Sequence, residues 1–167
     1  MKPERLIKKY WYAIPIIGVG GYMLIDRLPP KTRLWLGWLT TQRKIPFEAM
    51  YNQAKLETGN FTSQLYKDCH NLFGMTDYYT SPCGHTQPKI EEGKKAGMKY
   101  AGFRSDRDCM IQYQKKIATE GNHFYPCLHL AQGKNYTAYW ECLQKKGWAT
   151  DPHYAQKIIS LADKAYG

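Results

Sequence analysis

Glycine and proline interrupt the middle of this sequence so often that no long helix can pass through it. Within residues 77–103 they recur every few positions, at Pro82, Gly84, Pro88, Gly93, Gly97 and Gly102. Proline breaks helices and glycine weakens them, so this segment is predicted to form loops and a small hairpin. The periodic stretches on either side are helical in character, which makes a helical body with one irregular insert the expected architecture.

Five stretches carry a helical pattern of apolar residues. They cover residues 32–39, 46–57, 105–117, 136–145 and 151–166. Thr32 is expected to cap the first of them, and Pro46 fits the first turn of the second, where its missing N–H costs nothing. Asp151 and Pro152 form the expected start of the last helix. No internal repeat is visible.

A charge-free apolar run fills residues 10–25 and follows a basic start. As a helix these residues would span about 24 Å, short of the ~30 Å hydrocarbon core of a bilayer. The run is interpreted as a membrane anchor or uncleaved signal anchor, with a buried or partner-docking helix as the alternative. Pro29 and Pro30 form a stiff break after it. The expected organisation is therefore an N-terminal basic segment with an apolar helix (1–30) and one folded domain (31–167).

The net charge of +10 indicates anionic surroundings. Nucleic acid, a membrane surface and the acidic bacterial cell wall would all fit. The basic residues are spread along the chain, and no nucleic-acid-binding motif is present. No nucleic-acid partner is therefore expected.

The chain contains five cysteines, so at least one is unpaired if the others form disulfides within the chain. Three of them lie close to a histidine, but the four ligands at defined spacing that a zinc site needs are not recognisable. One or two disulfides formed in an oxidising compartment are the favoured interpretation, with buried free thiols as the alternative. No metal or cofactor is expected.

Glu57 is the candidate acid of the sequence. It ends an apolar helical stretch, and Gly59 just after it allows a sharp turn that would leave the carboxyl facing a cleft. Burial there would raise the pKa of the carboxyl and keep it protonated, as cleavage of a glycosidic bond requires. Taken alone, however, a glutamate at a helix end is usually a solvated surface residue.

Four sequence motifs favour the interpretation of Glu57 as a catalytic acid over that of a surface residue. They are residues 53–59 (QAKLETG), 69–75 (CHNLFGM), 103–110 (FRSDRDCM) and 147–158 (GWATDPHYAQKI). In order and spacing they resemble the glucosaminidase family, the flagellar-muramidase-like and autolysin-like peptidoglycan hydrolases of bacteria and phages. The resemblance covers about residues 45–167. Two departures stand out: His70 replaces the usual first asparagine of the second motif, and the tyrosine of the family's F-R-x-Y pattern is absent from the third.

The resemblance implies a mainly α (α+β) fold, a lysozyme-like helical domain with a small β-lobe at residues 77–103. It also implies roles for particular residues. Glu57 would be the general acid, and Tyr154 would line the cleft beside it. A second carboxylate is expected in the β-lobe, where Glu92 is favoured over Glu91 and Asp77 comes third. If an N-acetyl group of the substrate assists, no second carboxylate is needed.

The second motif is expected to shape the floor of the glycan groove. Asn71, Phe73 and Gly74 are its predicted substrate-binding residues. Cys69 and Cys83 flank the start of the β-lobe, so a disulfide between them is predicted to staple it.

The function that the resemblance implies is hydrolysis of β-1,4 bonds in the glycan strands of peptidoglycan, of the endo-β-N-acetylglucosaminidase type. N-acetylmuramidase specificity is one alternative. A non-catalytic, structural lysozyme-like protein of a phage particle or cell envelope is another. The single catalytic domain and the anchor-like start favour a phage or prophage lysis enzyme in the periplasm or cell envelope, with residues 10–25 as a candidate inner-membrane anchor.

Overall fold

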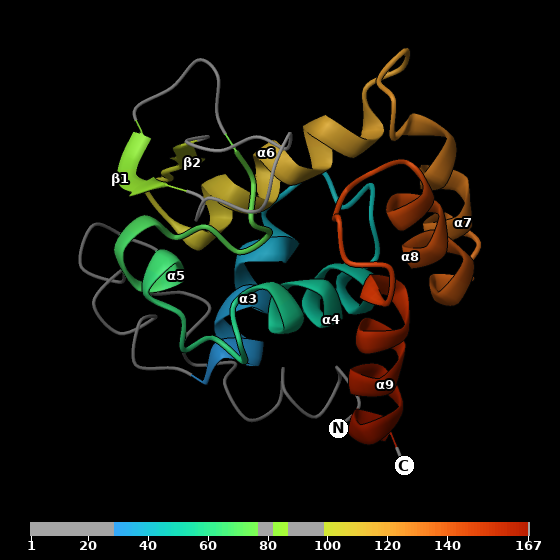
Figure 1. Cartoon of the computed structure of the whole chain (residues 1–167), viewed down its shortest axis with the longest axis horizontal. Coiled ribbons are helices and arrows are strands. Elements are labelled where there is room, and N and C mark those ends of the chain that lie inside the picture. The colour runs from blue at the N-terminus through green and yellow to red at the C-terminus, as the bar shows by residue number, and fades with distance from the viewer. Residues whose placement is uncertain (1–28, 77–81, 87–98, 167) are drawn as a thin grey trace.

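The computed structural model describes residues 29–76, 82–86 and 99–166 (Figure 1). Within these ranges the chain is mainly helical and contains one two-stranded antiparallel sheet, which confirms the predicted helical body with a small β-element. None of the helices in these ranges is long and apolar enough to cross a membrane. The apolar helix predicted over residues 10–25 lies outside the described residues.

The elements follow one another along the chain in a simple order. They are α3 (Pro30–Leu39), α4 (Phe47–Glu57), α5 (Gln64–Cys69), β1 (Pro82–Thr86), β2 (Lys99–Ala101), α6 (Asp106–Ala118), the 3-10 turn η2 (Tyr125–Cys127), α7 (Leu128–Gln132), α8 (Tyr136–Lys145) and α9 (Tyr154–Tyr166). The helices predicted over 46–57, 105–117 and 136–145 are confirmed. The short helices α5 and α7 were not predicted, because five or six residues carry too little periodicity.

Two predicted helix starts were wrong. The first helix begins at Pro30 and not at Thr32, which is buried inside it. Proline has no N–H to leave unpaired, so it is well placed in a first turn. The last helix begins at Tyr154, three residues after the predicted start at Asp151. The side chain of Asp151 instead accepts a hydrogen bond from the backbone N–H of His153 in the preceding turn (2.9 Å).

Polar side chains fix the starts of three other helices. Ser63, Ser105 and Asn135 each accept a hydrogen bond from a backbone N–H three residues further on, at 3.2–3.3 Å. Such caps satisfy N–H groups that have no partner within the helix. In α6, aspartates in the first turn and lysines in the last turn also complement the helix dipole.

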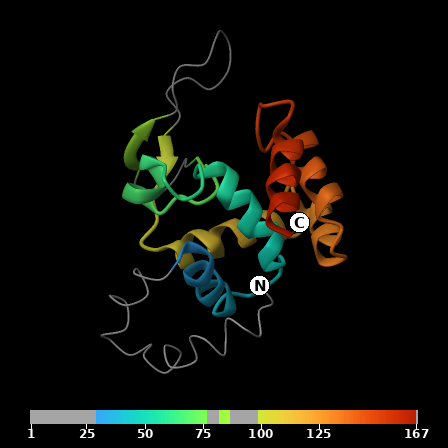
Figure 2. The same cartoon turned by 90° about the horizontal axis from the view of Figure 1, so that it is seen from below.

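Helix α4 lies at the centre of the fold (Figure 1). It packs against α3 and α9, while α3 also packs on α6 and α8 packs on α9. The hairpin and α5 lie on one side of α4, and α7, α8 and α9 lie on the other (Figures 1 and 2). In the hairpin, Pro82 is paired with Ala101 and Thr86 with Lys99. Helix α4, which ends in Glu57, therefore lies between the two sides of the fold.

One disulfide is described in full. It joins Cys127 in η2 to Cys142 in α8. Cys109 is a buried free thiol, so the expectation of an unpaired cysteine is confirmed. Cys69 is disulfide-bonded. The side chain of Cys83 lies outside the described part of the structure, so the pairing of these two stays a prediction.

Candidate active site

Glu57 lies where α4 ends in a tight turn. The hydroxyl of Thr58 donates to the carbonyl of Ala54 (2.6 Å) and accepts from the N–H of Phe61 (2.9 Å). Gly59 has a φ of 55°, and the next two residues are also left-handed. Glycine adopts this conformation without steric cost. The sharp turn predicted at Gly59 is therefore present, and it stops the helix directly after the acid.

Two side chains donate hydrogen bonds to the same oxygen of Glu57. The hydroxyl of Tyr154 donates to Oε1 at 2.7 Å, and the indole N–H of Trp148 donates to it at 3.3 Å. Burial raises the pKa of Glu57 to about 7, although both hydrogen bonds act in the opposite direction. The carboxyl therefore keeps its proton to higher pH than an ordinary glutamate, as a general acid requires.

Gly74 lies against the other oxygen of Glu57. A Cβ at residue 74 would lie 2.9 Å from Oε2, and the backbone φ of 61° is left-handed. Asn71 holds this loop in place: its Nδ2 donates to the carbonyls of Met75 (2.8 Å) and Ala101 (3.0 Å), and its Oδ1 accepts from the N–H of Met75 (3.0 Å). Asn71 is buried, and its hydrogen bonds to Met75 and Ala101 fix the loop beside the acid.

Phe73 is also buried and forms part of an aromatic layer behind Glu57. Its ring stacks on Tyr113 with centroids 3.9 Å apart and planes 23° apart. Trp148 packs edge-on against the same tyrosine at 5.3 Å. Phe73 and Trp148 thus hold Tyr113 from two directions.

The structure brings three of the six predicted site residues into direct contact and places a fourth beside them. Glu57, Tyr154 and Gly74 are in contact, and Asn71 fixes the loop that carries Gly74. Phe73 directly precedes Gly74 in the chain, and its ring packs on Tyr113 and not on the Glu57 carboxyl in the contacts described above. Glu92, and with it Glu91 and Asp77, lies outside the described residues, so the predicted second carboxylate stays a prediction.

Three residues of the site were not predicted: Trp148, Gln53 and Tyr113. Trp148 and Gln53 belong to the recognised motifs, and Gln53 is one helical turn before Glu57, which was the available signal. Nothing in the sequence marked Tyr113, whose hydroxyl donates to Oε1 of Gln53.

The two departures from the family pattern lie side by side. His70 replaces the usual asparagine, and Asp106 stands where the F-R-x-Y pattern has tyrosine. Nδ1 of His70 lies 3.0 Å from the Asp106 carboxylate, which also accepts from Nε of Arg33 (2.8 Å) and the hydroxyl of Tyr66 (3.0 Å). The buried carboxylate is therefore paired. The two residues that depart from the family pattern, His70 and Asp106, therefore contact each other.

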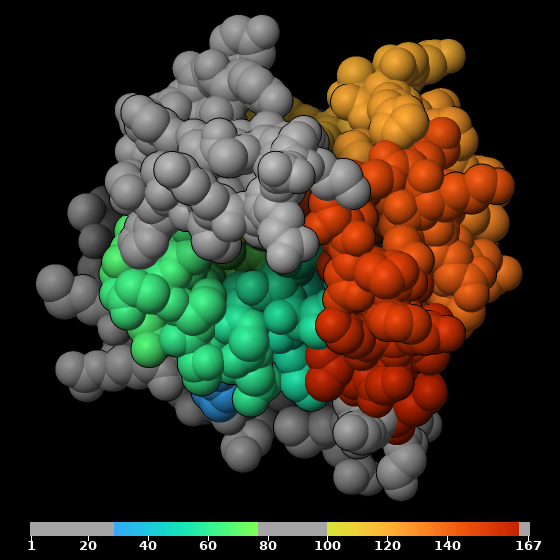
Figure 3. All heavy atoms as spheres, in the orientation of Figure 1, coloured from blue at the N-terminus to red at the C-terminus, as the bar shows by residue number. Residues whose placement is uncertain are grey.

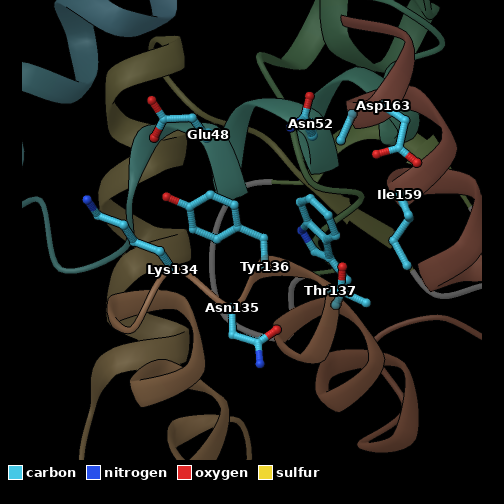
Figure 4. Close-up of a pocket in the computed structure, with 10 residues that line it drawn as sticks. Glu48, Asn52, Lys134, Asn135, Tyr136, Thr137, Ile159 and Asp163 are labelled. Carbon is cyan, nitrogen blue, oxygen red and sulfur yellow. The ribbon is translucent and has the colours of Figure 1, made fainter. Parts of the chain in front are cut away.

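A surface pocket of about 370 Å³ lies elsewhere, between α4, α8 and α9 (Figure 4). Its lining consists of Glu48, Asn52, Lys134, Asn135, Tyr136, Thr137, Trp140, Ile159, Ala162 and Asp163. None of the side chains that touch the Glu57 carboxyl belongs to it. Within the described ranges, no group of three or more His, Cys, Asp or Glu side chains converges into a metal site.

Two solved structures share this fold. The catalytic domain of the autolysin Auto from Listeria monocytogenes superposes with a TM-score of 0.62 at 20% identity, covering 99% of this chain and 96% of that one. A glycoside hydrolase domain of FlgJ from Salmonella typhimurium gives 0.55 at 23% identity, covering 85% and 95%. These likenesses support the predicted lysozyme-like fold.

Two proteins of known activity are similar to this chain in sequence. The exo-glucosaminidase LytG of Bacillus subtilis is 30% identical over 122 residues, which is 67% of this chain and 41% of LytG. The peptidoglycan hydrolase FlgJ of Escherichia coli K12 is 26% identical over 152 residues, 81% of this chain and 47% of FlgJ. This chain therefore spans less than half the length of either relative. The glucosaminidase family, described as mannosyl-glycoprotein endo-beta-N-acetylglucosaminidase, matches residues 39–167. The chain belongs to the glucosaminidase family.

Proposed function

We propose that this protein hydrolyses β-1,4 glycosidic bonds in the glycan strands of peptidoglycan, with Glu57 as the general acid. The observation that carries the proposal is the carboxyl itself. It is held at the end of α4 by Tyr154 and Trp148, and burial raises its pKa to about 7. A carboxyl with this pKa is protonated often enough near neutral pH to give its proton to a leaving oxygen.

The reaction would begin when the proton of Glu57 moves to the glycosidic oxygen as the bond to the anomeric carbon breaks. The resulting positive charge needs a partner on the other side of the sugar. Glu92 is the candidate, acting on a water molecule or as a nucleophile. An N-acetyl group of the substrate is the alternative. After transfer, Glu57 is a carboxylate whose Oε1 keeps both of its hydrogen-bond donors.

The relatives and the charge support peptidoglycan as the substrate. FlgJ is named a peptidoglycan hydrolase, and LytG an exo-glucosaminidase. The net charge of +10 favours binding to an anionic cell wall. We favour an endo-acting glucosaminidase of the cell envelope, with muramidase cleavage as the alternative. A phage or prophage lysis role, with residues 10–25 as an inner-membrane anchor, completes the proposal.

The decisive experiment compares wild-type protein with Glu57→Gln on purified peptidoglycan. Glu48→Gln is the matched control, because Glu48 lies at the opposite end of the same helix. We expect the control to release muropeptides at the wild-type rate and Glu57→Gln to release none. Release by Glu57→Gln at the wild-type rate would remove Glu57 from the mechanism.

Two further measurements test the finer parts. Mass spectrometry of reduced products shows which sugar carries the new reducing end: N-acetylglucosamine supports glucosaminidase cleavage, and N-acetylmuramic acid supports muramidase cleavage. Membrane fractionation of the full chain tests the anchor. Recovery of all protein in the soluble fraction without detergent would contradict it.

A further inference from the structure

A chain of buried hydrogen bonds runs from the core to the acid. The hydroxyls of Tyr139 and Tyr113 lie 2.6 Å apart, and Tyr113 also bonds to Oε1 of Gln53. Nε2 of Gln53 donates to the hydroxyl of Tyr154 (2.9 Å), which donates to Oε1 of Glu57 (2.7 Å). The four residues behind Glu57 are each at most 4% exposed. This chain of hydrogen bonds is therefore screened from water.

Along these hydrogen bonds, donation can run in only one direction if every proton is to find an acceptor among the described residues. Burial raises the pKa of the Tyr113, Tyr139 and Tyr154 phenols, so each keeps its single proton. If Tyr139 donates to Tyr113, the remaining donations run through Gln53 to Tyr154 and end on Glu57. In the opposite direction the Tyr139 proton would have no acceptor among the described residues, and leaving a buried donor unpaired is unfavourable.

This direction makes the two oxygens of Glu57 unequal. Oε1 receives donors from both Tyr154 and Trp148. Oε2 lies beside Gly74, where the absence of a Cβ leaves it room. An oxygen that accepts two hydrogen bonds is the carbonyl-like oxygen of a protonated carboxyl, so the acidic proton belongs on the other one.

We propose that Gln53 and Tyr113 are positioning residues that direct the Tyr154 proton to Oε1, so that Glu57 carries its catalytic proton on Oε2, beside Gly74. The catalytic role of this proton rests on the function proposed above. The placement of the proton does not, because it follows from the hydrogen bonds alone.

Tyr113 decides the orientation of Gln53. Its single proton needs an acceptor, and Oε1 of Gln53 is the acceptor within reach when Tyr139 donates or is removed, so the Gln53 atom that faces Tyr113 must be its oxygen. Without it, the Gln53 amide can rotate and present Oε1 to Tyr154. Tyr154 would then donate to Gln53 in place of Glu57. Loss of that donor would raise the pKa of the Glu57 carboxyl, because hydrogen bonding to the charged form lowers it.

The test compares Tyr113→Phe with Tyr139→Phe, two losses of one buried hydroxyl. The probe is the Glu57 carboxyl resonance in full-length protein labelled with 13C-glutamate, assigned with Glu57→Gln and followed over pH. We expect Tyr113→Phe to titrate at higher pH than wild type. Tyr139→Phe should titrate as wild type does, because Tyr113 still donates to Gln53.

Tyr113→Phe leaves the Tyr139 hydroxyl without its acceptor and is expected to lower stability for that reason. The double variant Tyr113→Phe/Tyr139→Phe removes both groups and should fold with less loss, while showing the same upward shift. Wild-type titration in both variants that lack the Tyr113 hydroxyl would overturn the proposal. An equal shift in Tyr139→Phe would also overturn it.

The readout separates this proposal from the proposed function. The titration needs no substrate, so failure of the wild-type protein to cleave peptidoglycan would leave the proton placement standing. If the protein does cleave peptidoglycan, the high-pH limb of kcat/KM should move upward in Tyr113→Phe as the resonance does. An unmoved limb beside a shifted resonance would show that the group whose titration limits cleavage is not Glu57.

Discussion

Oε2 of Glu57 lies 2.9 Å from the point where a Cβ of residue 74 would lie, and its carboxyl carbon lies 3.6 Å from the same point. Gly74 thus satisfies two demands at once. Its φ of 61° is in the left-handed region, and its missing side chain leaves space for the acid. The glycine of the second motif is therefore coupled directly to the glutamate of the first.

We predict that Gly74→Ala loses activity for a reason beyond strain. The added methyl group would displace the Glu57 carboxyl, and a misplacement of about 1 Å costs roughly 100-fold in rate. Gly121→Ala is the control, because Gly121 also has a positive φ (80°) but nothing within 4 Å of its Cβ position. Both variants should lose about 1–2 kcal/mol of stability. Kinetics on peptidoglycan should show the rate loss in Gly74→Ala alone; equal activities would contradict the contact.

Tyr154→Phe is predicted to move the high-pH limb of the activity profile upward. Protonated Glu57 is the active form, so activity falls as pH rises through its pKa of about 7. Tyr154 lowers this pKa, and a hydrogen bond to a charged group contributes about 1.5–3 kcal/mol, or roughly 1–2 pH units. The midpoint should therefore lie at about 8 or above. Tyr136→Phe, on the wall of the separate pocket, should leave the kcat/KM profile unchanged.

Much of this site could be predicted because its motifs are short and local. Glu57 and Gly59 are neighbours in sequence, and the turn between α4 and the next segment follows from that spacing. Tyr154 was reached through the fourth motif. The sequence could not show that both Tyr154 and Trp148 donate to one oxygen, since 91 or more residues separate them from Glu57.

Tyr113 shows a different reason for a missed residue. Its spacing in α6 is that of an ordinary core position, and it is fully buried as expected for one. Only the positions of Gln53 and Tyr139, on two other helices, turn its hydroxyl into a link of the hydrogen-bond chain. A residue that is both core and polar link cannot be recognised from periodicity, which reports the face and not the partner.

Glu57→Gln is predicted to be more stable than wild type above neutral pH. Burial raises the pKa from its ordinary 4.5 to about 7, so the folded state binds a proton more tightly than the unfolded state. That advantage is complete below pH 4.5 and is lost as pH rises to about 7, leaving an ionised buried carboxyl. The loss amounts to at most about 3 kcal/mol.

Urea unfolding at several pH values checks this prediction. The stability of wild type relative to Glu57→Gln should fall between about pH 4.5 and 7 and level off above that range. Glu48→Gln, at the other end of α4, should follow the wild-type curve. A constant difference between wild type and Glu57→Gln at all pH values would show that the Glu57 carboxyl is not destabilised by burial.

The Cys127–Cys142 disulfide is predicted to stabilise the fold without touching the acid. It closes a loop of 15 residues between η2 and α8, and a loop of that length corresponds to about 3 kcal/mol. The double variant Cys127→Ala/Cys142→Ala should lose about that amount in urea unfolding, more than Cys109→Ala, which removes one buried sulfur and no cross-link. The pH midpoint of kcat/KM should stay where it is in the double variant, because neither cysteine is a member of the hydrogen-bond chain that ends on Glu57. A loss no larger than that of Cys109→Ala would show that packing, and not the cross-link, is what these sulfurs contribute.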